Sequence, residues 1–167
     1  MFVRRVFGLL PAFVRYTLAL PEIAAGRQTK WFALLREGYE NDAGLLEHEL
    51  THVRQWYALL GACAALGVLL SAALWLLGGL LLWMAALAVM PGALVMGVYA
   101  HGRLYTVSAR YRLWAEAAAY REQLRHYPED DTEDKRRLRF MLFAMFLTLP
   151  AYRLSITQDE AEAVMRA

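Results

Sequence analysis

The sequence predicts a mainly α-helical protein in which a hairpin of two membrane-spanning helices is inserted into one small domain, residues 1–167. Two observations carry this prediction. No Asp, Glu, Lys or Arg occurs between Gln55 and Gly102, and about 20 helical residues suffice for one crossing of a bilayer. The chain is also unusually apolar, with 59% hydrophobic and 20% charged residues and a mean hydropathy of +0.28.

Composition also excludes several classes of protein. So high an apolar content is not that of a disordered chain or an acidic tail. Cys63 is the single cysteine, so the chain cannot form an internal disulfide and suits a reducing compartment. The net charge of +2 lacks the concentrated basic face that nucleic-acid binding normally requires, so no nucleic-acid partner is expected.

The N-terminal region is predicted to lie outside the membrane core. In residues 1–20 a short apolar run is interrupted by Pro11 and Arg15, which predicts an amphipathic segment at the membrane interface. A signal peptide is the alternative. Gln28–Arg36 (QTKWFALLR), apolar and bounded by glycines, predicts a strand.

The next segment, Leu45–Tyr57 (LLEHELTHVRQWY), predicts a helix with a metal-binding motif. Apolar residues recur at helical spacing, and Asp42 is a suitable N-cap. Residues four apart share a helix face, so His48 and His52 can ligate one metal ion while Glu49 reaches a metal-bound water. The alternative is a pair of surface histidines that ligate nothing.

The charge-free stretch then predicts two spanning helices, 56–77 and 80–100, with a turn at Gly78-Gly79. Trp75 and Trp83 bracket that turn, as aromatic residues do at a membrane interface. Pro91 should kink the second helix without ending it. The alternative is a buried hairpin in a soluble protein, but so small a domain has too little surface to cover it.

The flanks of the hairpin predict its orientation. Arg54 precedes the first arm and Arg103, Arg110 and Arg112 follow the second, while the turn carries no charge. The positive-inside rule therefore places both flanks, with the histidine motif, on the cytoplasmic side of an inner membrane.

Polar helical segments are predicted to complete the chain. Residues 107–127, rich in Ala, Arg and Glu, predict a helix, and the acidic and basic run up to Arg139 predicts a solvated loop and helix start. Phe140–Leu149 is too short to span and either packs on the domain or lies at the interface. Thr157 and Glu160 form a candidate capping box for a last helix.

A third metal ligand is expected, because a catalytic zinc usually has three protein ligands and a water. His101, His126 and Glu122 are candidates, but Glu116 is favoured. It lies on the helix that follows the hairpin, which returns it beside the histidine motif, and its alanine neighbours permit close helix packing. A solvated glutamate is the alternative. Two imidazoles and a carboxylate suit Zn²⁺.

The motifs HELTH and YRLWAEAAAYREQL, separated by a membrane hairpin, resemble the gluzincin class of zinc metallopeptidases. The order of elements is similar to that of integral-membrane heat-shock metallopeptidases, CAAX prenyl proteases, the sensor peptidases of β-lactam resistance, and small predicted metallopeptidases of bacteria and phages. The resemblance covers about Gly38 to Gln123. It implies a minimal zincin-like core made of an active-site helix, a small strand element and a third-ligand helix.

The same resemblance implies roles for individual residues. His48, His52 and Glu116 would be the zinc ligands and Glu49 the general base. The chain departs from the membrane peptidases in two ways. Tyr120 stands where they usually carry an aspartate that orients a ligand histidine, and no spanning helix is expected before the histidine motif. Both departures bear on efficient proteolysis and not on metal binding.

Peptide hydrolysis at such a centre also needs a donor to the tetrahedral oxyanion. The residues that could donate are Tyr105, Tyr111, Tyr120, His101 and Arg112. The sequence does not choose among them. Each tyrosine is equally suited to a packing role. The strand at Gln28–Arg36 could bind an extended peptide by edge pairing, or it could be an ordinary sheet edge.

The predicted function is a membrane-anchored, zinc-dependent endopeptidase that acts on peptide or protein substrates by means of a zinc-activated water and a glutamate general base. Its expected partners are such a substrate and the lipid membrane. The alternative from another class is a non-catalytic zinc-binding membrane adaptor or interaction protein. A membrane-disrupting, holin-like hairpin, in which the metal motif would be coincidental, is a third hypothesis.

Overall fold

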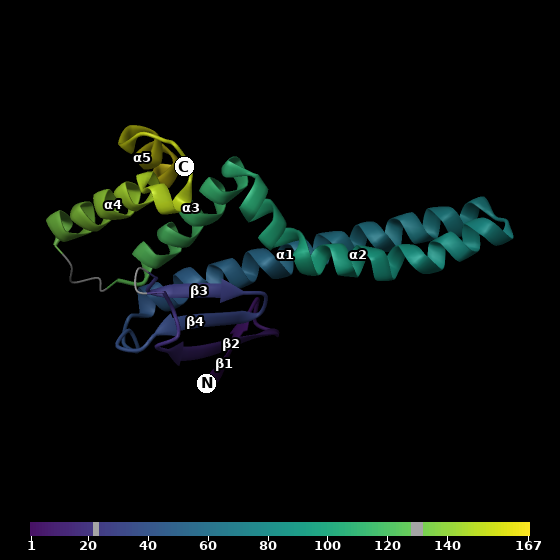
Figure 1. Cartoon of the computed structure of the whole chain (residues 1–167), viewed down its shortest axis with the longest axis horizontal. Coiled ribbons are helices and arrows are strands. Elements are labelled where there is room, and N and C mark those ends of the chain that lie inside the picture. The colour runs from purple at the N-terminus through teal and green to yellow at the C-terminus, as the bar shows by residue number, and fades with distance from the viewer. Residues whose placement is uncertain (22–23, 128–131) are drawn as a thin grey trace. The chain divides into compact units, whose positions relative to one another are not determined.

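The computed structural model describes residues 1–21, 24–127 and 132–167. These residues form four strands, five α-helices and one short 3-10 helix (Figure 1). The contacts within the chain divide it into two compact units, the first made of Met1–Arg54 and Tyr105–Ala167 and the second of Gln55–Leu104. The chain is therefore mainly helical with a small sheet, as predicted; the loop predicted at residues 128–131 lies outside the described residues.

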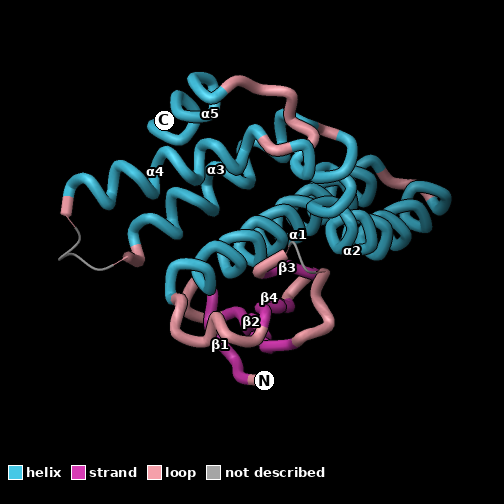
Figure 2. The backbone as a smooth tube through the Cα atoms, turned by 60° about the vertical axis from the view of Figure 1, so that its left-hand side comes forward, coloured by secondary structure: helices cyan, strands magenta, loops and turns pink. Residues whose placement is uncertain are grey.

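The first unit begins with a four-stranded sheet. Its strands are β1 (Phe2–Val6), β2 (Leu10–Thr17), β3 (Gly26–Thr29) and β4 (Phe32–Arg36). They lie in the order β1-β2-β4-β3, with β2 and β4 parallel and the two outer pairs antiparallel (Figure 2). β3 is thus an edge strand.

Residues 1–20 contain the β1–β2 hairpin, in which Phe7 and Gly8, both at positive φ, turn the chain; their location at a membrane interface stays a prediction. One prediction for this region is wrong. The predicted strand Gln28–Arg36 is two strands, since Lys30 at φ 54° begins a tight turn between β3 and β4.

Helix α1 (Ala43–Leu77) follows the sheet. The Asp42 carboxylate accepts a hydrogen bond from the Leu45 N–H at 2.8 Å, which satisfies one of the free N–H groups at the helix start, as predicted. The histidine motif and the first predicted spanning segment lie on this one continuous helix. α1 contributes residues 43–54 to the first unit and 55–77 to the second.

The second unit is an antiparallel pair formed by the rest of α1 and most of α2 (Leu80–Val107). Gly78 and Gly79 adopt φ of 75° and 95°, so the turn lies where the sequence predicts it, at residues that tolerate a left-handed backbone. α2 also continues through Pro91. The Trp75 and Trp83 rings stack at the turn, 5.4 Å apart.

The two arms pack through small residues and buried polar contacts. A Cβ atom on Gly67 would lie 2.6 Å from that of Ala93, so only glycine permits this approach. The Trp56 indole donates to the Val98 carbonyl at 2.9 Å, and the Ser71 hydroxyl donates to the Ala86 carbonyl at 2.9 Å. Small residues and such hydrogen bonds are typical of helix pairs in membranes.

Both long helices pass the length and composition requirement for a membrane span. Their most apolar windows have mean hydropathies of 2.2 and 2.1, and only 6% and 11% of those windows is buried within the protein. A soluble core helix would be mostly buried. The hairpin is therefore long and apolar enough to cross a membrane, and it exposes the apolar side chains that a bilayer would cover.

The remainder of the first unit is helical. It comprises α3 (Ala109–Arg125), α4 (Glu133–Thr148), the 3-10 helix η1 (Pro150–Tyr152) and α5 (Gln158–Arg166). α5 begins with the predicted capping box. The core of these helices consists of Ala117, Tyr120, Phe143, Ala144, Leu147, Leu154, Ala161 and Met165.

Candidate metal centre

The first turns of α1 present both histidines of the motif on one face. The rings of His48 and His52 are 5.1 Å apart and inclined at 74°. Leu50 and Val53, on other faces of the same turns, are buried in the core, which fixes the rotation of the helix. The four-residue spacing thus gives two imidazoles that face the same point in space.

Glu116 of α3 reaches that point. One carboxylate oxygen lies 3.5 Å from His48 Nε2 and the other lies 3.3 Å from His52 Nε2. All three side chains are buried, with exposed fractions of 6%, 6% and 3%. Among the candidates for a third ligand, Glu116 is the one that the structure places with the two histidines.

The donor set fits zinc. Zinc binds imidazole nitrogen at about 2.0–2.1 Å and carboxylate oxygen at about 2.0–2.2 Å, so two such ligands at a tetrahedral angle lie about 3.3–3.5 Å apart. The observed separations of 3.3 and 3.5 Å match this value. The candidate ligand atoms of the three residues all lie within 4.8 Å of one another. His48, His52 and Glu116 could therefore hold one ion.

Glu49 lies against the sheet at the beginning of β3. A Cβ atom on Gly26 would be 2.4 Å from Glu49 Oε1, so the glycine makes room for this carboxylate. Glu49 Oε2 and His48 Nδ1 are buried and have no hydrogen-bond partner within the described part of the chain. A buried carboxylate oxygen is costly to leave in this state, which suits a group whose partner is a water or a substrate.

The two glutamates experience opposite electrostatic effects. Burial raises the pKa of Glu49, and this effect outweighs the nearby His48 and His52, which lower it. Burial would also raise the pKa of Glu116, but its close contacts with the same two histidines dominate and hold that pKa below its ordinary value. Glu116 is therefore ionised, which is the form that binds a metal.

Tyrosines surround the histidines and Glu116. The Tyr105 hydroxyl donates to Glu116 Oε1, and the Tyr120 ring packs edge-on against His48 at 4.6 Å. The Tyr120 hydroxyl in turn bonds to the Tyr152 hydroxyl at 2.5 Å. Burial raises the pKa of both Tyr120 and Tyr152, so both stay protonated. Sequence reasoning missed Tyr152, because η1 lies far from the motif along the chain.

Arg112 binds two backbone segments that carry these tyrosines, one at Tyr105 and one at Tyr152. Its guanidinium donates to the carbonyls of Tyr105 and Thr106 at the end of α2, to that of Tyr152, the last residue of η1, and to that of Arg153, which follows it. These bonds give Arg112 a positioning role, because they fix the two segments that supply the hydroxyls of Tyr105 and Tyr152.

None of the other predicted residues joins His48, His52 and Glu116 in the ligand group found among the described residues. His101 is buried on α2 in the second unit. Tyr111 of α3 packs against Trp114 with ring centroids 5.6 Å apart, and burial raises its pKa to about 12. Glu122 and His126 are grouped with Glu47 in a separate cluster.

Comparison with protein families, with curated proteins and with solved structures gives no match for this chain.

Proposed function

We propose that this protein is a membrane-anchored, zinc-dependent endopeptidase. Its minimal zincin-like core would comprise the first half of α1, the β1–β4 sheet and α3, with the hairpin inserted between the two ligand-bearing helices. The observation that carries the proposal is the convergence of His48, His52 and Glu116 beside the buried carboxylate of Glu49.

The residues around the centre can perform the proton transfers of hydrolysis. When bound, zinc would lower the pKa of a water to about 7 and polarise a substrate carbonyl. Glu49 would accept a proton from the attacking water and pass it to the leaving amine. The Tyr105 hydroxyl orients Glu116 and is therefore already used. As the hydrogen-bond donor to the oxyanion we favour the hydroxyl pair of Tyr120 and Tyr152.

A substrate segment could bind along the sheet. β3 is an edge strand of the sheet, and its first residue, Gly26, contacts Glu49. An extended peptide that paired with β3 would run past the general base, which is the strand-addition mode of peptide recognition. Unfolded or membrane-adjacent segments are the substrates this arrangement favours.

A non-catalytic zinc-binding adaptor is the second candidate. The observation that favours it is burial, since His48, Glu49, His52 and Glu116 are all no more than 6% exposed, and structural zinc sites are closed whereas catalytic ones keep an open position. Glu49 separates the two candidates, because a structural site does not need this carboxylate.

Metal content is the first test. The full chain, purified in detergent, should contain about one zinc per chain by elemental analysis, given a single three-ligand site. Glu116→Ala should lose most of it, whereas Glu122→Ala, on the same helix but outside the centre, should retain it. A wild type without zinc would overturn both candidate functions and favour a membrane hairpin whose motif is coincidental.

Hydrolysis of unfolded, fluorogenic protein substrates is the second test. Glu49→Gln should retain zinc and lose activity by roughly 10²–10⁴-fold, the usual contribution of a general base. Glu47→Gln is the matched control, since Glu47 directly precedes His48 on α1 but is outside the centre, in an ion pair with Arg54. Zinc without hydrolysis in the wild type would favour the adaptor.

A further inference from the structure

Helix α4 exposes an apolar face that the metal centre does not explain. Its exposed members, Leu138, Met141, Leu142 and Met145, are between 40% and 67% exposed and recur at intervals of three and four residues, so they form one stripe along the helix. On the opposite side of α4, Phe143, Ala144 and Leu147 are buried in the core. The helix is thus apolar on its packed side and on its free side.

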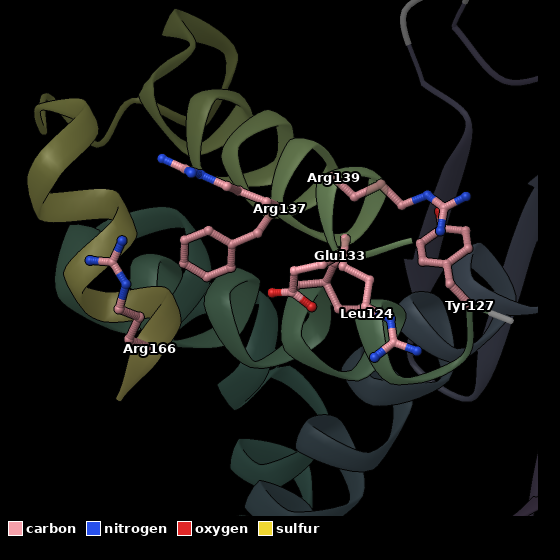
Figure 3. Close-up of a pocket in the computed structure, with 8 residues that line it drawn as sticks. Leu124, Tyr127, Glu133, Arg137, Arg139 and Arg166 are labelled. Carbon is pink, nitrogen blue, oxygen red and sulfur yellow. The ribbon is translucent and has the colours of Figure 1, made fainter. Parts of the chain in front are cut away.

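Basic residues accompany this stripe. After an acidic first turn with Glu133 and Asp134, α4 continues with Lys135-Arg136-Arg137-Leu138-Arg139, and Arg137 and Arg139 leave the helix toward opposite sides (Figure 3). Arg136, Arg137 and Arg139, together with Arg166 of α5, line a hollow of about 440 Å³ that contains one carboxylate, Glu133. The hollow is on the packed side of α4, where Leu124 and Tyr127 also line it. By helical spacing, Lys135 and Arg137 border the N-terminal end of the stripe on its two sides, and Asp134 lies in line with it.

We propose that α4 lies in the surface of an anionic membrane. The stripe would enter the boundary between headgroups and acyl chains, and Lys135 and Arg137 would contact lipid phosphates. An apolar face bordered by Lys and Arg is the arrangement that binds anionic lipid surfaces. The proposal is independent of the metal centre and concerns a different part of the first unit.

The charges favour lipid over a second copy of this chain. Two copies whose α4 helices met in parallel through the stripe would bring Lys135 and Arg137 of each chain toward those of the other, and like charges at a contact are unfavourable. Anionic phosphates instead complement these residues. The chain also carries a hairpin long and apolar enough to keep it at a membrane.

The test uses the full chain in lipid nanodiscs. A polarity-sensitive fluorophore is attached at Met145→Cys in a Cys63→Ser background, and quenching by lipids with a nitroxide near the headgroup is measured. The matched control carries the label at Asp159→Cys, an exposed position on α5. Discs contain phosphatidylcholine alone or with phosphatidylglycerol.

We expect the Met145 label to be quenched more strongly than the Asp159 label, and more in discs with phosphatidylglycerol. Lys135→Gln and Arg137→Gln should each shift the ratio of membrane-bound to unbound α4 by roughly fivefold, because one cation near an anionic surface contributes about 1 kcal/mol. Both residues are exposed, and an unchanged melting temperature in detergent verifies that the variants fold.

Two outcomes would overturn the proposal. In one, the Met145 label is as accessible to aqueous iodide as the Asp159 label in both kinds of disc. In the other, Met145→Cys chains form a disulfide with one another in dilute detergent and the lipid quenching is absent, which would identify the stripe as a contact between copies.

Discussion

Two clusters of histidine and glutamate lie where α1 and α3 approach each other, and they differ in burial. One is the metal centre formed by His48, His52 and Glu116. The other, defined by Glu47, Glu122 and His126, begins one residue earlier on α1, and its candidate ligand atoms also lie within 4.8 Å of one another. Residue type and proximity alone do not distinguish the two.

Their charge partners do distinguish them. In the second cluster, Glu47 is paired with Arg54 at 2.7 Å and Glu122 with Arg125 at 3.0 Å, so arginines already balance both carboxylates. In the metal centre the charge of Glu116 faces two histidines and a tyrosine hydroxyl. A buried carboxylate is costly unless a cation accompanies it. The buried cluster, whose carboxylate has no arginine partner among the described contacts, is therefore the one that we propose a metal ion would stabilise.

The removal of zinc should give the largest difference in thermal stability between variants of the two clusters. A ligand present at a thousand times its Kd stabilises the folded state by about 4 kcal/mol, which for a chain of this size is a shift of roughly 10 °C in melting temperature. Thermal unfolding with zinc or with a chelator measures it. The His126→Ala variant should respond like the wild type, and His52→Ala should not respond. An equal response in both variants would contradict the contrast.

Gly26→Ala should separate catalysis from metal binding within the centre. The added Cβ would displace the flexible Glu49 carboxylate without touching a ligand, and a misplacement of about 1 Å can cost roughly 10²-fold in rate. Zinc content should not change. Gly61→Ala, where no atom lies within 4 Å of the new Cβ, is the control. Unchanged hydrolysis by the Gly26→Ala variant would remove Glu49 from the reaction.

Tyr105→Phe should weaken zinc binding by roughly 10–100-fold, the usual effect of losing a group that orients a ligand. The variant keeps the ring and loses the hydrogen bond to Glu116. Tyr111→Phe removes a hydroxyl from a tyrosine of α3 that packs on Trp114 and should leave the affinity unchanged. Competition with a chromophoric chelator measures both. Equal affinities would show that Glu116 needs no such support.

Sequence reasoning was most successful where a local signal is strong. The charge-free stretch, the glycine pair and the capping box each identified an element correctly, because each signal is contained in one continuous segment of the sequence. The placement of Glu116 beside His48 and His52 also followed, since a closed hairpin must bring its two flanks together.

The sequence was less informative where an element or a contact depends on residues that are far apart along the chain. The strand β1 became recognisable only through its partner β2, since five residues that include two arginines (FVRRV) carry a weak signal alone. Tyr152 is beside Tyr120 because α4 reverses the chain and Arg112 holds η1 in place. No spacing in the sequence encodes that contact. The four bonds of Arg112 to backbone carbonyls were equally invisible.

The smallest predicted effect is on stability and concerns Glu160, whose carboxylate is exposed, in contrast with the buried carboxylates of Glu49 and Glu116. Glu160 accepts a hydrogen bond from the Thr157 N–H in the capping box of α5, and this bond lowers the pKa of Glu160. Because the folded-state pKa lies below the unfolded one, the stabilisation is complete above the unfolded pKa and is lost as pH falls through the folded value.

Thr157→Ala removes the helix cap and also the hydroxyl that donates to Glu160 Oε2 at 3.0 Å, a bond that further lowers the pKa of Glu160. The variant should therefore lower the free energy of unfolding by about 1 kcal/mol at neutral pH, and the difference from wild type should narrow in acid, where Glu160 is protonated. Thr132→Ala is the matched control, because the Thr132 side chain caps α4 by accepting from the Lys135 N–H. This helix has Lys135 at the position where a capping box needs a glutamate. Its effect should not depend on pH. Denaturant titrations at neutral and acid pH compare the two, and parallel behaviour of the two variants would contradict a role for Glu160, since the caps differ in that carboxylate.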